Sequence, residues 1–319
     1  GGAARCGRSD KPGTSVCRGD RTLVSAITET SGLTAAARID LVLSDRWVAY
    51  PQGQTALQRL EELLRGAQRT RMPSLLIVGD PDMGKTTILR KFMRGRAPTF
   101  DAETGRSQME VVAIEAPPEA DELRLYGIIL DAVGAPTPTR RAMEAERAVH
   151  GQLERLRTRL LVIDETNNLM IGTGAAQRKT LAALRRLSNT LSLSMAYFGT
   201  LEALNALTSD PQIEGRAQPF RLSRLAKDET YAAIVAAVVG HFPLRMKSQV
   251  DDAFVGAVHE ISGGSPGKTF RLLNAAAVEA IDSGRERITV ESLHAEEVVR
   301  HVRTAMAMRR GARVRAAAG

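Results

Sequence analysis

The sequence is poor in cysteine and aromatic residues and has no long apolar run. Its two cysteines, Cys6 and Cys17, lie at no metal-binding spacing from histidine or from each other, so we interpret them as incidental thiols. One Trp, four Tyr and seven Phe are too few to supply the stacking platforms of a single-strand nucleic-acid binder. No apolar stretch approaches the roughly 18 residues that would span a bilayer, and residues 1–20 lack the apolar core of a secretory signal. These absences predict a soluble chain with a cytoplasmic location and no membrane partner.

Arginine, in contrast, is abundant. The chain has 37 Arg and 7 Lys against 36 acidic residues, which gives a formal net charge of +8. Because a guanidinium stays charged and binds phosphate through two parallel hydrogen bonds, this excess favours a partner that carries phosphate. High-GC codon bias also produces chains rich in Arg and Ala, so composition alone leaves both interpretations open. If nucleic acid binds, we expect contacts to its backbone to dominate.

The 319 residues suffice for one large domain or two modest ones. Residues 1–35 are rich in Gly, Ser, Thr and Arg without periodicity, which indicates a flexible basic arm. Residues 36–225 alternate short apolar runs with helical patterns, residues 226–308 show helical patterns alone, and residues 309–319 form a basic tail. The sequence therefore predicts an α/β domain, with a parallel sheet flanked by helices, followed by a small all-helical domain.

Patterning places the individual elements of the α/β region. Apolar runs predict strands at residues 75–79, 111–115, 160–164 and 193–199, and a short apolar stretch follows at 220–222. Helical spacing predicts helices at residues 45–66, 84–93, 121–133, 142–157 and 177–191. Beyond residue 228 the helical pattern is broken at Pro243, at Gly263 and Gly264, and at Gly284.

Residues 79–86, GDPDMGKT, match the phosphate-binding pattern G-x-x-x-x-G-K-[ST] in full. The motif lies between a strand and a helix, where successive backbone N–H groups and the positive end of the helix point at a polyphosphate. Lys85 is expected to reach the β- and γ-phosphates, and the Thr86 hydroxyl to ligate the bridging Mg²⁺. A glycine turn before a surface helix is the simpler alternative. The predicted nucleotide contacts are Gly79, Asp80, Pro81, Asp82, Met83, Gly84, Lys85, Thr86 and Thr87.

The third predicted strand runs directly into Asp164 and Glu165. Two acids at the end of a strand that is buried on both faces are costly unless they meet a cation or take part in chemistry. We expect Asp164 to hold Mg²⁺ through water, and Glu165 to orient and deprotonate the water that attacks the γ-phosphate. Acids after a strand can also simply cap the next helix. Together with the phosphate-binding motif, the pair predicts hydrolysis of a nucleoside triphosphate.

Two further residues complete the predicted catalytic set. Thr200 follows the fourth strand, where its hydroxyl would contact the γ-phosphate or the lytic water, or else would cap the next helix. Arg216 follows that helix on an expected domain edge, from which an arginine can enter a neighbouring subunit's site and neutralise transition-state charge. A solvated surface role is the alternative for Arg216, because arginine is so abundant here.

The order of these features resembles that of AAA+ ATPases, and five segments resemble TniB, the family of transposon ATP-binding proteins related to TnsC regulators. The segments are DRWVAYP (45–51), RMPSLLIVGDPDMGKT (71–86), DETNNLMIGT (164–173), QRKTLAALRRLSN (177–189) and FGTLEALNALTSDPQIEGR (198–216). The likeness spans about residues 40–280. It implies an AAA+ fold with a helical lid, ATP as the nucleotide and ATP hydrolysis as the activity.

The resemblance also implies partners. Such proteins assemble on duplex DNA as rings or helical filaments and hand the target to a DDE transposase of TniA or TnsB type, often with a TniQ-like adaptor. By the family pattern, the Trp47 to Pro51 segment, with Tyr50 as a nucleotide contact, would lie by the adenine, and Arg216 would act across the subunit interface. We therefore expect an ATP-dependent regulator of bacterial transposition, associated with the nucleoid when on DNA, in which slow, DNA-stimulated hydrolysis controls disassembly of the homo-oligomer.

The sequence departs from the family pattern in the lid. Gly264-Ser265-Pro266 is followed by Gly267 and Lys268, where many AAA+ proteins carry an arginine that senses the nucleotide. The resemblance leaves Lys268 or Arg271 as a substitute for this second sensor, and either could equally be an ordinary lid charge. Asn167 stands where we expect His in relatives.

DNA contacts are implied for three basic residues. In such assemblies the pore-facing loops follow the second and third strands, which implies phosphate contacts by Arg124, Arg178 and Lys179. Each of the three is alternatively a solvated charge. Six arginines between Arg300 and Arg315 suggest a further DNA- or transposase-binding segment.

Three other functions fit parts of the pattern. A P-loop kinase would transfer the γ-phosphate to a small molecule, although Glu165 aimed at water would waste ATP. A nucleotide-gated adaptor would bind ATP without cleaving it. Helicase and replication loaders share the expected fold.

Overall fold

A computed structural model describes residues 32–67, 69, 71–137, 141–208 and 215–302. The predicted arm up to residue 31, the predicted tail at 309–319 and the arginines from Arg303 onward lie outside these ranges. Within them, no helix is long and apolar enough to cross a membrane.

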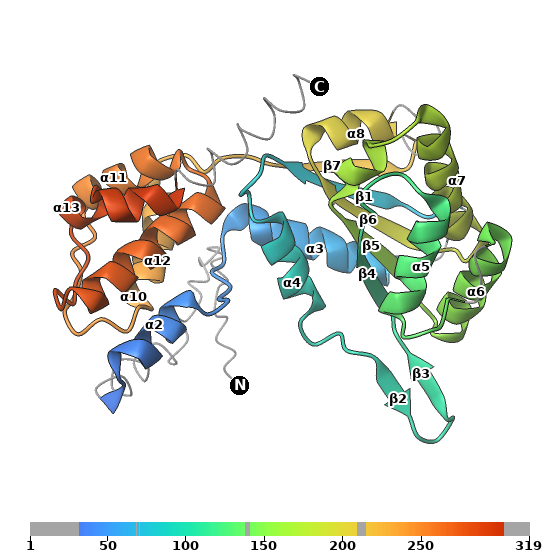
Figure 1. The fold of residues 1–319 in the computed structure, drawn as a ribbon, viewed down its shortest axis with the longest axis horizontal. Coiled ribbons are helices and arrows are strands. Elements are labelled where there is room, and N and C mark those ends of the chain that lie inside the picture. Colours follow the sequence, from blue (N-terminus) through green and yellow to red (C-terminus); the bar gives the residue numbers. More distant parts are fainter. Residues whose placement is uncertain (1–31, 68, 70, 138–140, 209–214, 303–319) are drawn as a thin grey trace, which may run out of the picture.

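Five parallel strands form the central sheet, in the order β4-β5-β6-β1-β7 (Figure 1). They are β1 (Ser74–Gly79), β4 (Val111–Glu115), β5 (Leu160–Asp164), β6 (Ser194–Gly199) and β7 (Ala217–Leu222). Every residue of β1, β5 and β6 is buried, because these interior strands are covered on both faces. The predicted fold class, a parallel sheet flanked by helices with more helices behind it, is therefore confirmed.

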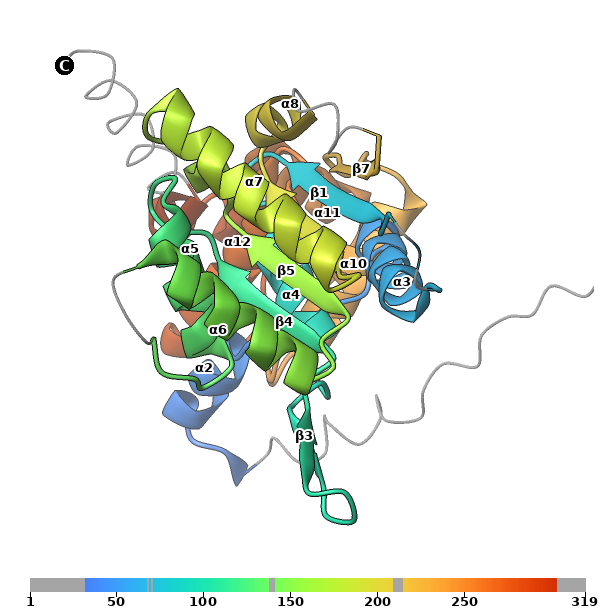
Figure 2. The same cartoon turned by 90° about the vertical axis from the view of Figure 1, so that its right-hand side faces the viewer.

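Helices cover both faces of this sheet. One face packs against α3 (Pro51–Arg65) and α4 (Lys85–Met93). The other packs against α5 (Glu122–Ala132), α6 (Ala142–Arg155) and α7 (Gly174–Thr190), which lie in front of the strands in Figure 2. Alternate residues of each strand serve the two faces: Leu75 and Ile77 point to α3 and α4, and Leu76 to the opposite cluster.

Short elements connect the strands at the edge where β5 and β6 end. The 3₁₀ helix η3 (Thr166–Met170) follows β5, and α8 (Leu201–Thr208) follows β6. The sequence predicted a helix from residue 45, but α3 begins only at Pro51 and residues 45–50 are not helical. Proline at the first helical position fixes this start, because its ring already has a helical φ and it lacks the N–H that would go unbonded there.

The remaining helices form a second group beside the sheet (Figure 1). They are α10 (Glu229–Gly240), α11 (Asp252–Ser262), α12 (Pro266–Asp282) and α13 (Val290–Leu293). An N-terminal helix, α2 (Ala35–Leu43), also packs on α12 rather than on the sheet. The boundary that we placed near residue 225 stays a prediction, but α2 lies with the helical group although it precedes the sheet in sequence.

A buried ion pair fixes α2 to this group, which we call the lid helices (α10–α13). The Arg38 guanidinium donates to both carboxylate oxygens of Glu286, at 2.6 and 2.8 Å, and to the carbonyl oxygen of Pro243 at 3.1 Å. The two side chains are only 3% and 12% exposed. Two residues 248 positions apart in the chain therefore hold α2 in place.

A β-hairpin that the sequence analysis did not predict leaves the body of the molecule between α4 and β4 (Figures 1 and 2). Its antiparallel strands are β2 (Thr99–Asp101) and β3 (Arg106–Gln108). Phe100 on β2 is 67% exposed.

Candidate active site

The phosphate-binding motif forms the connection between β1 and α4. Asp82 and Gly84 have left-handed backbones, with φ of 69° and 85°, and so turn the chain sharply before the helix. A Cβ on Gly84 would lie 2.9 Å from the Tyr50 hydroxyl, so only glycine fits there. Lys85 donates from Nζ to the carbonyl oxygens of Gly79 and Asp80, at 2.7 and 3.0 Å. The loop thus turns sharply into the N-terminus of α4, and the Lys85 ammonium lies over the loop. This local geometry fits a polyphosphate.

The other predicted contacts of the loop differ in exposure. Pro81 and Thr87 are exposed, whereas the Met83 side chain is buried in the core and leaves only its backbone at the loop surface. A Cβ on Gly79 would meet Leu222 of β7 at 3.1 Å, so the end of β7 packs tightly against the start of the loop.

The two predicted Mg²⁺ ligands lie in contact. The Thr86 hydroxyl donates to Asp164 Oδ2 at 3.1 Å, which brings the first turn of α4 to the end of β5. Burial raises the pKa of Asp164, and hydrogen bonds from the Glu165 backbone N–H (2.8 Å) and from Thr86 act in the opposite sense. A hydroxyl and a carboxylate are the hard oxygen ligands that Mg²⁺ prefers. Among the described residues no cluster of three or more His, Cys, Asp and Glu could hold a metal, so Mg²⁺ here would share its shell with water and phosphate oxygens.

Glu165 lies at the same edge of the sheet, exposed and beside Asp164. Its φ of 51° is left-handed, a backbone conformation that costs a non-glycine residue of order 1–3 kcal/mol. The next residue explains how the conformation is held: the buried Thr166 hydroxyl donates to the Phe198 carbonyl oxygen at 2.9 Å. A Cβ on Gly199 would lie 2.3 Å from Thr166 Oγ1, so glycine allows η3 to approach β6 this closely.

Thr200 follows Gly199 at the carboxyl end of β6, between β5 and β1 in the sheet. Its hydroxyl oxygen accepts the Ala203 backbone N–H at 3.4 Å and donates to Glu202 at 3.3 Å. Thr200 therefore caps α8, as the structural alternative expected, at the same sheet edge as Asp164.

Arg216 lies at the opposite edge of the sheet. Its carbonyl oxygen accepts the backbone N–H of Ser74, the first residue of β1, at 3.0 Å. Its guanidinium donates to Asn189 Oδ1 of α7 at 2.6 Å. The six residues of β1 separate this end of the sheet from the phosphate loop (residues 79–86) by a distance on the order of 20 Å. The geometry does not bring Arg216 to the phosphate loop of its own chain.

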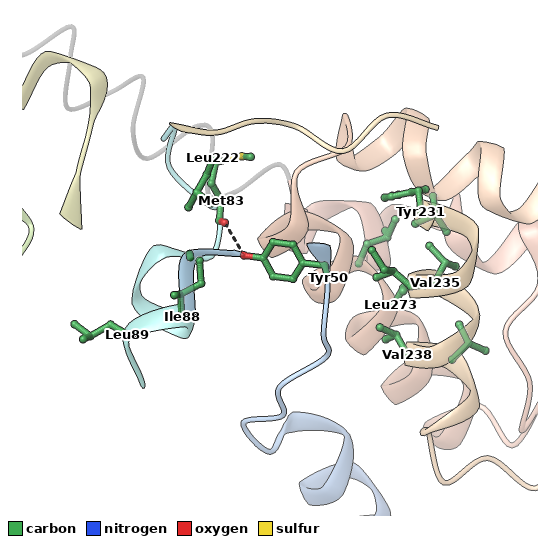
Figure 3. Close-up of a cluster of buried hydrophobic side chains, with 14 of the residues drawn as sticks. Tyr50, Met83, Ile88, Leu89, Leu222, Tyr231, Val235, Val238 and Leu273 are labelled. Carbon is green, nitrogen blue, oxygen red and sulfur yellow. Dashed lines mark hydrogen bonds between the residues drawn. The ribbon is translucent and has the colours of Figure 1, made fainter. Parts of the chain in front are cut away.

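A cavity of about 290 Å³ lies between the phosphate loop, residues 42–50 and the lid helices. Trp47, Tyr50 and Thr87 line it together with Phe270 of α12. Tyr50 is buried, its hydroxyl donates to the Met83 carbonyl oxygen at 3.3 Å, and burial raises its pKa (Figure 3). Its ring lies 5.8 Å from that of Trp47. Aromatic side chains beside a phosphate loop are typical of a cavity that takes a planar base, and the role of Tyr50 stays a prediction.

The lid reaches the phosphate loop at the N-terminus of α12. Gly267 N–H and the Ser265 hydroxyl donate to the Asp82 carbonyl oxygen at 2.8 and 2.9 Å. Arg271 pairs with the Asp82 carboxylate at 3.1 and 3.0 Å, whereas Lys268 is 6% exposed in the first turn of the helix. Arg271, one of the two proposed second sensors, therefore contacts the loop.

Arg224, which the sequence analysis did not single out, also reaches the loop. It lies in the connection from β7 to α10, 3.8 Å from the Asp80 carboxylate, and donates to the Gly263 carbonyl oxygen at 3.2 Å. No local pattern distinguishes it from the other 36 arginines.

The loops predicted to face DNA lie side by side. Arg124 is in the first turn of α5, Arg178 and Lys179 are near the start of α7, and all three are exposed. The Ala120 backbone N–H donates to the Ile171 carbonyl oxygen at 2.9 Å, which joins the loops that precede these helices. The structure thus gathers the three cations on neighbouring helix starts, and their role stays a prediction.

The strand order, with a phosphate loop after the interior strand β1 and an acid pair at the end of β5, places the chain among the AAA+ ATPases. Solved structures with this fold include Cdc6p from Pyrobaculum aerophilum, at 20% identity over 79% of this chain and 69% of that chain, with a TM-score of 0.59. The Orc1 protein of Aeropyrum pernix in complex with DNA has 19% identity over 84% and 69%, with a TM-score of 0.60. The Orc2 protein of the same organism, in ADPNP and ADP complexes, has 17% identity over 84% and 71%, with a TM-score of 0.55. At these identities the likeness shows the fold.

Within that class, the family model described as bacterial TniB protein matches residues 38–227. The chain belongs to the TniB family, which confirms the resemblance noted in the sequence. No curated protein matches the chain.

Proposed function

We propose that this chain is an ATP-dependent, DNA-binding regulator of transposition that assembles on duplex DNA and is released by its own ATP hydrolysis. The observation that carries the proposal is the contact between Thr86 and Asp164, at 3.1 Å, beside a complete phosphate loop in a member of the TniB family. ATP and Mg²⁺ are the proposed ligands. The phosphate loop fits the triphosphate, the oxygen atoms of Thr86 and Asp164 fit Mg²⁺, and the aromatic-lined cavity fits the adenine.

Each side chain at this edge has a part in the proposed hydrolysis. ATP supplies the γ-phosphoryl group. Lys85 neutralises the charge of the β- and γ-phosphates, while Thr86 and Asp164 hold Mg²⁺. Glu165 accepts the proton of the attacking water, whose oxygen bonds to the γ-phosphorus as the bond to the ADP oxygen breaks. Thr200 would orient that water or the γ-phosphate.

Arg216 supports an assembly rather than a lone subunit. Because it lies at the far edge of the sheet, it is suited to enter the site of a neighbouring copy, where it would neutralise transition-state charge. Contacts of this head-to-tail kind form rings when they close and helical filaments when they do not. We therefore propose a homo-oligomer whose sites are completed between subunits.

Arg124, Arg178 and Lys179 would line the surface of that assembly that follows the DNA backbone. Family membership supports the partners proposed for the DNA-bound form, a DDE transposase of TniA or TnsB type and a TniQ-like adaptor. Hydrolysis would then act as a timer that dissolves the complex.

The test combines turnover with imaging. We expect slow phosphate release that duplex DNA accelerates, and ordered assemblies by electron microscopy only with duplex DNA and a non-hydrolysable ATP analogue. Glu165→Gln should lower turnover by at least about 100-fold and trap the assembly with ATP itself. Glu260→Gln, an exposed acid on α11, is the matched control and should behave as wild type.

Three results would contradict the proposal. If duplex DNA leaves ATP turnover unchanged and no oligomer forms with ATP, the chain is not a DNA-dependent regulator. A Glu165→Gln variant that assembles and disassembles as wild type indicates a nucleotide-gated adaptor. Transfer of the phosphoryl group to a metabolite indicates a kinase.

A further inference from the structure

The phosphate loop carries more negative than positive charge of its own. Two carboxylates, Asp80 and Asp82, stand within six residues of a single ammonium, Lys85. Carboxylates so close to a polyphosphate repel it, and the repulsion grows where water is excluded. The loop therefore needs cations from elsewhere in the fold to hold a triphosphate.

Asp82 obtains its cation from the lid. Its carboxylate, in a side chain only 13% exposed, meets Arg271 Nη1 at 3.1 Å and Nη2 at 3.0 Å, across 189 residues of sequence. Its carbonyl oxygen accepts Gly267 N–H and the Ser265 hydroxyl. The left-handed backbone of Asp82 makes this possible, because it turns both groups toward α12. One loop residue thus provides both the backbone contact and the ionic contact with the lid helix.

Arg271 retains capacity for another acceptor. Its Nε is buried without a hydrogen-bond partner, and the side chain lines the 290 Å³ cavity beside the loop. A guanidinium has five donor hydrogens and matches phosphate as well as it matches carboxylate. The Arg271 guanidinium would therefore meet two acceptors of the same kind, the oxygens of a polyphosphate in the loop and those of the Asp82 carboxylate.

We propose that Asp82 is a positioning residue that docks the lid on the phosphate loop through Arg271, and that bound nucleotide competes with its carboxylate for this guanidinium. The inference rests on the proposed function, because it concerns the same nucleotide site. The Asp82–Arg271 pair holds α12 on the loop. Binding of a triphosphate draws Arg271 from the carboxylate, so the pair lowers nucleotide affinity and couples occupancy to lid position.

The test is a set of affinity measurements with Mg-ATP. Asp82→Asn keeps the size of the side chain, and Asn tolerates a left-handed backbone, so the variant removes little besides the charge. We expect it to tighten ATP binding about three- to fivefold. Arg271→Gln should weaken binding, and in its background the gain from Asp82→Asn should shrink, because there is no guanidinium left to release. Asp252→Asn is the matched control: Asp252 is an exposed carboxylate in the first turn of α11, away from the loop, so affinity should change less than twofold.

A second measurement needs no nucleotide. In the free protein, hydrogen exchange of the amides at residues 265–271 should be faster in Asp82→Asn than in wild type, because the ionic half of the docking contact is gone. Unchanged exchange, or ATP affinity equal to or weaker than that of wild type, would overturn the inference. A wild-type chain without affinity for ATP, or a Lys85→Ala chain that binds as wild type does, would instead overturn the nucleotide site itself, so the two failures are distinguishable.

Discussion

At the scale of single residues, Asp164 serves two opposed requirements. Its position at the buried end of β5 suits a metal ligand, but a carboxylate there is poorly solvated. The resulting rise in its pKa above that of the unfolded chain means that ionisation costs more in the folded state. The stability contribution is therefore unfavourable above the folded pKa and disappears as the pH falls below the unfolded value, where both states are protonated.

Asp164→Asn should raise the melting temperature of the metal-free, nucleotide-free protein at about pH 7, and the gain should vanish at low pH, near about pH 4 and below. The same variant should lose ATP hydrolysis. Thermal unfolding across this pH range, with phosphate release measured in parallel, tests the sign. A variant that is less stable than wild type at neutral pH would show that the contacts from Thr86 and Glu165 outweigh burial.

Some residues of the candidate site could be predicted from the sequence and others could not. The phosphate loop and the acid pair are local patterns, so the sequence located them without knowledge of the fold. The Asp82–Arg271 contact joins residues 189 positions apart, and no local pattern selects Arg271 over Lys268. Whether Arg271 reaches the loop is decided by how α12 docks, and that is a property of the tertiary structure.

At the scale of elements, α2 illustrates why one helix escaped prediction. Its sequence AAARIDLVL follows a Gly-rich segment, and its main packing partner is α12, more than 220 residues later. The hairpin β2–β3 was missed because none of its strand residues is buried and they carry no apolar alternation. β7 was reduced to its last three residues because an edge strand with Pro219 lacks the apolar run of an interior strand. The four strands that were predicted are the ones with such runs.

The Arg38–Glu286 pair should be essential for docking of α2. The hydrogen bond from Arg38 lowers the pKa of Glu286 in the folded protein. The stabilisation is therefore present at a pH above the pKa of this carboxyl in the unfolded chain, and it is lost as the pH falls through its pKa in the folded protein. Arg38→Ala leaves the buried carboxylate with only the Arg245 backbone N–H at 3.3 Å and the exposed Arg245 guanidinium 3.9 Å away, and should cost about 3 kcal/mol of unfolding free energy near neutral pH. Urea unfolding measures this.

Arg285→Ala serves as the control for that prediction. Arg285 pairs with Glu279 at 2.7 Å, but its side chain is 55% exposed, so its loss should cost no more than about 0.5 kcal/mol. Adding Glu286→Gln to Arg38→Ala should recover part of the lost stability. Equal effects of Arg38→Ala and Arg285→Ala would mean that the buried pair contributes no more than a surface one.

At the scale of the whole molecule, the separation between Arg216 and the phosphate loop predicts complementation between subunits. Arg216→Ala and Glu165→Gln should each be nearly inactive alone. Mixed in equal amounts, they should recover about a quarter of wild-type ATPase activity, the share of random head-to-tail interfaces that join an intact site to an intact arginine. Steady-state phosphate release of the mixture measures this, and a mixture no more active than its parts would place Arg216 outside the site.

The predicted DNA surface gives a second test at this scale. Arg178→Ala combined with Lys179→Ala should reduce the slope of log affinity against log salt by about 2, without a change in sequence preference. Fluorescence anisotropy with duplex DNA and a non-hydrolysable ATP analogue at several salt concentrations provides the measurement. Arg65→Ala, an 81% exposed arginine on α3, is the control and should leave the slope unchanged. An unchanged slope in the double variant would remove the start of α7 from the interface.

The non-helical segment before α3, residues 45–50, determines the tryptophan fluorescence of the protein. Trp47 is the only tryptophan of the chain, and its ring lies against Tyr50 in the cavity between loop and lid. The tryptophan emission of the unlabelled protein, excited where its tyrosines do not absorb, therefore arises from one indole at one place. Its intensity and wavelength should report directly on whatever enters that cavity, so the protein carries its own spectroscopic probe.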